Sequence, residues 1–180
     1  DVHSNQELSL NNVPLLSDVH TMKELLESLG CEASYHNLKK TIKIKLLREG
    51  LFLADYDIVK KMRASILVLG PLLTRFGQGI VALPGGCAIG ARPVDMHLMA
   101  LEALGARFSI DKGYVKGTVA GSLKGCKIRF PFVSVGATAN TIMAAVLAKG
   151  TTELVNAARE PEIIDLCKCL KSMGCEIEGE

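Results

Sequence analysis

The 180-residue sequence contains no tryptophan, and aromatic residues make up only 4% of it. Its charges nearly cancel, with 21 Lys and Arg against 19 Asp and Glu. No basic run is interleaved with aromatic residues, which argues against nucleic acid as the main partner. No apolar run approaches the ~20 residues of a membrane span, since the most apolar one, residues 64–73, is short and contains Gly70 and Pro71. The sequence therefore predicts a soluble protein with neither nucleic acid nor a membrane as partner, and it shows no signal peptide.

The six cysteines lack the spacing of a metal site or of a redox pair. Cys167 and Cys169 form a CxC pattern without the second pair that a zinc site needs, and no CxxC is present. Together with Cys31, Cys126 and Cys175, they fit the pattern of small apolar core residues. We therefore predict reduced thiols, a cytoplasmic location, no metal site and no cofactor.

At 48% hydrophobic residues, the chain can fill one sizeable core or two small ones. A helix pattern that ends in Leu or Met, followed by glycine and a strand pattern, recurs around Gly30, Gly105 and Gly174. Such internal similarity indicates a supersecondary unit used several times. The order of the unit is βαβαββ, which favours an α/β or α+β fold with helix-covered sheets. We predict a single domain with pseudo-repeats at roughly 1–46, 47–119 and 120–180.

Within a unit, glycine ends a helix and a hairpin-like pair of strands follows, as in residues 31–36 with residues 41–46. A second helix pattern then precedes the next strand. It covers residues 56–76 in the second unit and residues 137–148 in the third. The sequence thus predicts one long helix before the strand at residues 80–83.

Residues 83–93 (LPGGCAIGARP) are the most informative segment for function. Cys87 lies among glycines, five residues before Arg92 and just ahead of a helix pattern. Glycines let the backbone approach a ligand, free N–H groups form an anion nest, and Arg92 offers a forked partner for phosphate or carboxylate. Asp95 either caps the following helix or orients Arg92. The pattern predicts an anion site with a reactive cysteine.

Three further candidates are less specific. Residues 132–138 end a strand pattern and open a helix, where N–H groups and the helix dipole can hold an anion. Ser134 or Thr138 as a simple N-cap explains the pattern too. Arg63 interrupts an apolar helix pattern, either as a solvated residue or as a charge directed at a ligand. His97 follows the cysteine segment, and a lone helical histidine of this kind is expected to be packed rather than catalytic.

Taken together, these runs resemble the UDP-N-acetylglucosamine 1-carboxyvinyltransferases, a family of enolpyruvyl transferases. The resemblance implies a two-lobed inside-out α/β barrel with three βαβαββ units in each lobe, of which this chain would be one lobe. It covers about two thirds of the chain in the family's order, at residues 54–57, 62–66, 69–71, 83–95, 133–138, 150–152 and 156–162.

The resemblance also implies a reaction and its residues. The enolpyruvyl group of phosphoenolpyruvate is transferred to the 3-hydroxyl of UDP-N-acetylglucosamine with release of phosphate, as the first committed step of peptidoglycan synthesis. Cys87 would be the general acid on the methylene carbon of phosphoenolpyruvate, and it can also form a covalent adduct. Phe132 stands where many members have lysine. The implied substrate-binding residues are Arg63, Arg92, Pro93, Val94, Asp95, Met96, Phe132, Val133, Ser134, Val135 and Gly136.

The family's second lobe, with its catalytic aspartate, would lie beyond Glu180, and a Lys-Asn pair that binds phosphoenolpyruvate would lie before Asp1. We therefore expect the chain to need that lobe as its partner and to have negligible turnover alone. One alternative remains open, a non-catalytic sugar-nucleotide or anion-binding module of the same fold. Cys87 and the run Arg92-Pro-Val-Asp95 decide against a shikimate enolpyruvyl transferase, in which the cysteine segment is not expected.

Overall fold

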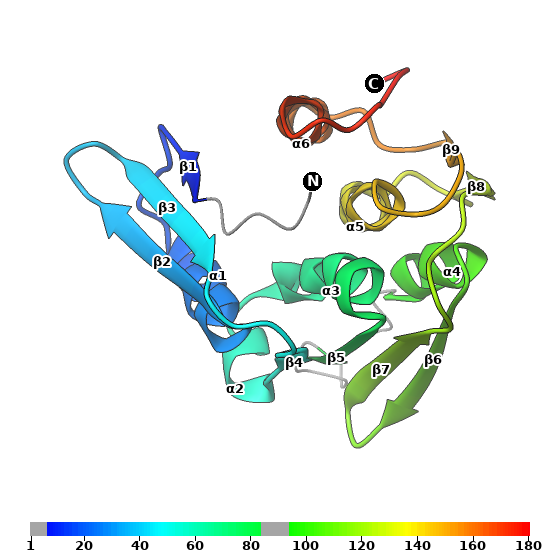
Figure 1. Ribbon diagram of the computed structural model, residues 1–180, viewed down its shortest axis with the longest axis horizontal. Helices are drawn as coiled ribbons and strands as arrows, with labels where there is room; N and C mark the ends of the chain where they lie inside the picture. The colour runs from blue at the N-terminus through cyan, green and yellow to red at the C-terminus, as the bar shows by residue number, and fades with distance from the viewer. Residues whose placement is uncertain (1–6, 84–93) are drawn as a thin grey trace.

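The computed structural model describes residues 7–83 and 94–180 (Figure 1). Three sheets lie toward the outside, and the helices α3, α4 and α5 lie between them. This arrangement, with helices toward the middle and sheets outside, is the inside-out α/β lobe that the resemblance implies. The predicted division into three repeats stays a prediction.

The first sheet has the order β1-β3-β2 and is antiparallel. Its hairpin confirms the predicted pairing, because Cys31 lies opposite Leu46 and His36 lies opposite Thr41. Gly30 precedes the hairpin with a φ of 94°, and a Cβ atom there would lie 2.3 Å from a backbone oxygen of the next segment, so only glycine fits. The elements are β1 (Leu8–Leu10), α1 (Ser17–Ser28), β2 (Cys31–His36) and β3 (Thr41–Leu46).

The second sheet has the order β4-β5-β7-β6, in which β4 and β5 are parallel and the other pairs antiparallel. Over residues 53–119 the described elements follow the predicted order βαβαββ, with the first helical part divided in three. They are β4 (Leu53–Ala54), α2 (Tyr56–Val59), η1 (Arg63–Val68), α3 (Leu69–Phe76), β5 (Gln78–Ala82), α4 (Asp95–Ala103), β6 (Ala106–Asp111) and β7 (Tyr114–Val119).

The prediction of one helix over residues 56–76 is wrong, because the segment forms α2, the 3₁₀ helix η1 and α3 in turn. Met62, between α2 and η1, has an extended backbone with φ −147° and ψ 122°, which interrupts the helical conformation. Pro71 lacks the N–H that an interior helical residue donates, so it is accommodated in the first turn of α3 rather than in the middle of a long helix.

The third sheet pairs β8 (Lys127–Arg129) with β9 (Glu153–Val155) in parallel. Helix α5 (Val135–Ala145) connects the two strands, so the predicted helix over residues 137–148 begins and ends earlier than expected. Helix α6 (Pro161–Ser172) starts with proline in its first turn, where the missing N–H costs nothing.

The core lies between the central helices and the sheets that cover them. Leu69 and Leu73 of α3, Leu101 of α4 and Phe130 after β8 are almost fully buried. Each such side chain contributes roughly 2 kcal/mol to stability through its removal from water. Within residues 7–83 and 94–180, no helix has the length and apolar character needed to cross a membrane.

Candidate active site

The structure describes only part of the predicted site. Cys87, Arg92 and Pro93 lie outside the described residues. The backbone of Arg63 begins η1, and its side chain is likewise outside the description. The remaining predicted residues occupy two places, the start of α4 and the start of α5.

The start of α4 carries Val94, Asp95 and Met96. Asp95 is exposed in the first turn, where a carboxylate is favourable to the helix dipole. The side chain of Met96, in contrast, is only 5% exposed and belongs to the core. Any contact between Met96 and a ligand therefore has to come from its backbone.

The start of α5 is built by Ser134, whose extended backbone precedes the helix and whose Oγ accepts a hydrogen bond from Ala137 N at 3.3 Å. The predicted N-cap is thus confirmed. Among the described residues, the backbone N–H groups of Val135 and Gly136 find no acceptor. Free N–H groups at the positive end of a helix dipole can bind an anion.

The segment before α5 is apolar and exposed. The side chains of Phe132 and Val133 are 53% and 51% exposed. Because phenylalanine carries no charge, this position can contact a ligand through its ring or its backbone but cannot pair with a phosphate. At this end of α5, the described groups that could accept an anion are therefore backbone N–H groups rather than the side chains of Phe132 and Val133.

The starts of α4 and α5 are neighbours, and His97 lies between them. Its side chain is 8% exposed, which confirms that it is packed, and its Nδ1 lies 3.1 Å from Nδ2 of Asn140 on α5. Burial lowers the pKa of His97 to about 4, so the imidazole is neutral at pH 7. Asn140 escaped the sequence analysis, because its partners are distant in sequence.

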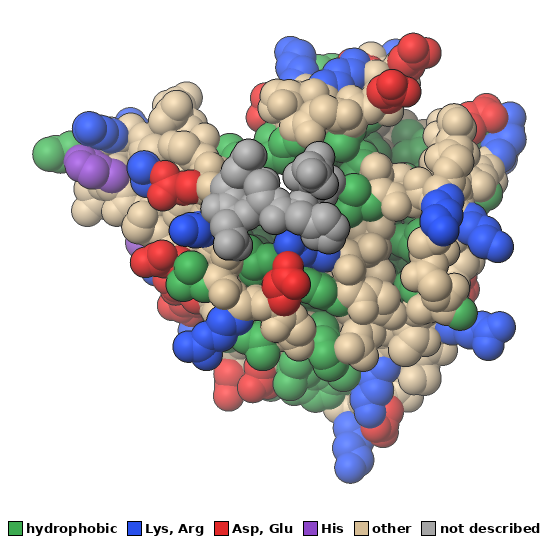
Figure 2. All heavy atoms as spheres, viewed as in Figure 1, with side chains coloured by type: hydrophobic (Ala, Val, Ile, Leu, Met, Phe, Trp, Pro, Cys, Tyr) green, Lys and Arg blue, Asp and Glu red, His purple; other side chains and the backbone are tan. Residues whose placement is uncertain are grey.

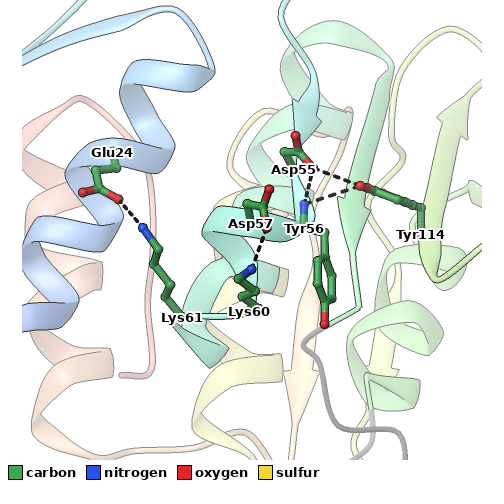
Figure 3. Close-up of polar contacts among 7 residues, drawn as sticks. All are labelled: Glu24, Asp55, Tyr56, Asp57, Lys60, Lys61 and Tyr114. Atoms are coloured by element: carbon green, nitrogen blue, oxygen red, sulfur yellow. Dashed lines mark hydrogen bonds and ion pairs between the residues drawn. The ribbon is translucent and has the colours of Figure 1, made fainter.

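The cysteine segment leaves the second sheet from β5, where Leu83 N donates to Gly113 O at 2.8 Å. Beside this point the Tyr114 hydroxyl donates to the Asp55 carboxylate at 3.0 Å, and that carboxylate caps α2 by accepting from Tyr56 N at 2.6 Å (Figure 3). These bonds tie β7 to the end of β4. The strand end from which the Cys87 segment departs is therefore held on both sides.

The charges that surround this end of the sheet form exposed pairs. Lys60 binds Asp57 at 2.6 Å, and Lys61 reaches Glu24 on α1 at 3.2 Å (Figure 3). Exposed pairs of this kind contribute little to stability. Among the described side chains on the face that Figure 2 shows, both basic and acidic ones are present.

Three of the described cysteines, Cys31, Cys126 and Cys167, have the environment of structural thiols. Burial raises the pKa of Cys31, Cys126 and Cys167, which favours the protonated, less nucleophilic form of these thiols. Cys126 in addition donates its Sγ proton to Ala103 O at 3.2 Å. Within the part of the chain that the structure describes, no three His, Cys, Asp or Glu side chains come together as metal ligands.

The arrangement of helices between three outer sheets can be compared with the folds of solved structures. Two solved structures share this fold. They are the enolpyruvyl transferase NikO from Streptomyces tendae, with a TM-score of 0.83 at 20% identity, and EPSP synthase from Acinetobacter baumannii, with 0.75 at 16%. Each match covers 98% of this chain, and 41% and 40% of the respective solved chains. The chain thus has the fold of one lobe of an enolpyruvyl transferase.

The family model of EPSP synthase (3-phosphoshikimate 1-carboxyvinyltransferase) matches residues 4–180, and the chain belongs to this family. Within it, the chain is similar to proteins named UDP-N-acetylglucosamine 1-carboxyvinyltransferase: it is 59% identical over 177 residues to the one from Dinoroseobacter shibae and 57% identical over 178 residues to the one from Cereibacter sphaeroides. Both matches cover 98% of this chain and 42% of the relative. The chain thus spans about two fifths of the length of these curated relatives, and the predicted resemblance is confirmed.

Proposed function

We propose that residues 1–180 form the cysteine-bearing lobe of a UDP-N-acetylglucosamine 1-carboxyvinyltransferase and that a second lobe completes its active site. The observation that carries the proposal is the pairing of the α4 and α5 starts, because His97 in the first turn of α4 lies against Gly136 and Asn140 of α5, beside the free N–H groups of Val135 and Gly136. The 59% identity to a protein of that name supports the choice of substrate.

The proposed binding of the sugar nucleotide uses both helix starts. The N–H groups at the start of α5 hold the diphosphate together with Arg92, whose guanidinium can bind phosphate oxygens through two parallel hydrogen bonds. Arg63 supplies further positive charge, and Pro93, Val94 and Asp95 line the nucleotide. Phe132 and Val133 contribute apolar or backbone contacts, because neither side chain is charged.

In the proposed reaction, the Cys87 thiol gives its proton to C3 of phosphoenolpyruvate, which makes C2 electrophilic. The sugar 3-hydroxyl adds to C2 and loses its proton to a base of the second lobe. From the tetrahedral intermediate, phosphate leaves C2 while C3 gives up a proton, so that the enol ether forms. A thiol suits this task when its pKa lies close to the working pH.

The proposed pathway role follows from the product. Enolpyruvyl transfer to UDP-N-acetylglucosamine is the first committed step of peptidoglycan synthesis, on which cell shape and division depend. A cytoplasmic location belongs to the same proposal, since both substrates are cytoplasmic metabolites. For residues 1–180 alone, we propose sugar-nucleotide binding without turnover, because the chain spans about two fifths of its relatives.

Thiol labelling of the complete protein tests the proposal. An epoxide phosphonate of the fosfomycin type should alkylate Cys87 faster when UDP-N-acetylglucosamine is present, while Cys31 and Cys126 stay unlabelled, as mass spectrometry of the peptides would show. Cys87→Ser is the control and should abolish the labelling and the release of phosphate. Shikimate 3-phosphate should give no product in place of the sugar nucleotide. Equal labelling of Cys87 and Cys126, with or without the nucleotide, would contradict the proposal.

A further inference from the structure

A buried polar network joins the central helices of the lobe. The side-chain amide of Asn140 on α5 is fully buried, and its Oδ1 accepts from Gly70 N at 2.9 Å. Its Nδ2 donates to Ile66 O at 3.2 Å and lies 3.1 Å from Nδ1 of His97. One amide thus connects η1, α3, α4 and α5.

The chemistry of the partners fixes the orientation of every group in this network. Gly70 N–H can only donate and Ile66 C=O can only accept, so the amide oxygen and nitrogen of Asn140 cannot be exchanged. Nδ2 therefore donates its second proton to Nδ1 of His97, and the ring proton of His97 sits on Nε2. The low pKa of this imidazole, about 4, agrees with a neutral ring.

The opposite edge of the His97 ring faces the start of α5. A Cβ atom placed on Gly136 would lie 3.3 Å from both Cε1 and Nε2 of His97. The ring thus lies along one turn of α5, between Gly136 and Asn140, while its own backbone is in the first turn of α4, two residues after Asp95. His97 therefore contacts both helix starts that the proposed function assigns to the sugar nucleotide.

We propose that His97 is a positioning residue of the sugar-nucleotide site, which fixes the start of α4 against the start of α5 through Asn140. The inference rests on the proposed function. The ring cannot turn or withdraw without leaving the second N–H of the buried Asn140 amide without an acceptor, which is unfavourable in a buried site. The distance between the start of α4 and the free N–H groups of α5 is thereby fixed. A ligand that contacts both helices requires such a fixed distance.

Two matched variants of the complete protein test this inference. In His97→Asn, the side-chain oxygen replaces Nδ1 and can still accept from Asn140. In His97→Gln, the amide extends to the Nε2 end and the bond to Asn140 is lost. We expect His97→Asn to bind UDP-N-acetylglucosamine within about threefold of the wild type and His97→Gln to bind it about tenfold more weakly, by isothermal titration calorimetry.

Kinetics separate positioning from folding. A positioning role raises the KM for UDP-N-acetylglucosamine in His97→Gln while the KM for phosphoenolpyruvate changes much less, whereas a purely structural role lowers the amount of active protein and leaves both KM values unchanged. Equal nucleotide binding by the two variants would overturn the inference, as would a loss that follows Tm alone. If the wild type itself did not bind the nucleotide, the proposed function would fail too; wild-type binding with an unchanged His97→Gln overturns only the positioning role.

Should His97→Gln not fold, Gly136→Ala is the second variant. The added methyl presses on the His97 ring at 3.3 Å without removing a hydrogen bond, and alanine favours the helix. We expect a folded protein with about tenfold weaker nucleotide binding. Unchanged binding would overturn the inference.

Discussion

The imidazole of His97 is held between α4 and α5, where burial lowers its pKa to about 4. In the unfolded chain the same group titrates near 6.5, so between these values the unfolded state binds more protons than the folded state. His97 therefore has no effect on the pH dependence of stability above pH 6.5, and the fold is destabilised as the pH falls toward 4. Between pH 6.5 and a pH below the folded pKa, the free energy of unfolding is expected to fall by about 3 kcal/mol because of His97.

Urea unfolding of this chain at a series of pH values, followed by circular dichroism because tryptophan is absent, measures this loss. The variant His97→Asn cannot titrate and should show a flatter acid limb. The exposed residue His36 offers the matched control, since His36→Asn should leave the limb as in the wild type. An unchanged acid limb in His97→Asn would show that His97 does not govern it.

Substitutions at Ser134 can separate two properties of the start of α5, the stability of the helix and its capacity to bind an anion. Ser134 caps the helix, and the same helix end offers free N–H groups to the proposed diphosphate. Ser134→Ala should lower the free energy of unfolding by about 1 kcal/mol through loss of the cap. Ser134→Asp should keep the cap, because aspartate is a good N-cap residue, but its negative charge should weaken binding of UDP-N-acetylglucosamine about tenfold.

Urea unfolding and calorimetric titration of both variants check this pair of effects. In Ser134→Asp, stability and binding should change independently, which excludes misfolding as the cause of weaker binding. Binding as tight as in the wild type would mean that no anion lies at this end of α5.

The elements differ in how far local sequence determines them. The hairpin at residues 31–46 could be predicted, because a left-handed glycine and two short alternating strands act locally. The division of residues 56–76 into α2, η1 and α3 could not be predicted, because the same apolar sequence pattern is compatible with an α-helix and with a 3₁₀ helix. The close approach of α3 and α5 was also hidden: it depends on Gly70, where a Cβ atom would lie 2.4 Å from Oδ1 of Asn140.

The candidate site shows the same limit. The glycine-rich segment around Cys87 and the cap at Ser134 have local signatures, so the sequence indicates both. Asn140 has none, because its partner His97 is 43 residues away and its partner Gly70 is 70 residues away. Only packing of the helices brings them together. Candidate residues that belong to a local motif could therefore be named from the sequence, whereas Asn140, which contacts distant helices, could not.

The lobe has its own core, but the proposed reaction needs more than this lobe. The central helices are covered by sheets of the same chain, so residues 1–180 should retain the sites at α4 and α5 and bind UDP-N-acetylglucosamine. Proton transfer from Cys87 and attack by the sugar hydroxyl require both substrates, a base and exclusion of water, which closure of two lobes supplies. We expect phosphate release by residues 1–180 to be slower than by the complete protein by about a thousandfold or more.

Phosphate release with both substrates, compared at equal concentrations of the two proteins, measures this difference, and calorimetry of the same samples shows whether the lobe still binds the nucleotide. Cys87→Ser in the complete protein gives the background rate. Binding without turnover would place nucleotide recognition in this lobe and catalysis in the closed pair. Turnover by residues 1–180 near the rate of the complete protein would show instead that this lobe holds every group the reaction needs, including the base that takes the proton of the sugar hydroxyl.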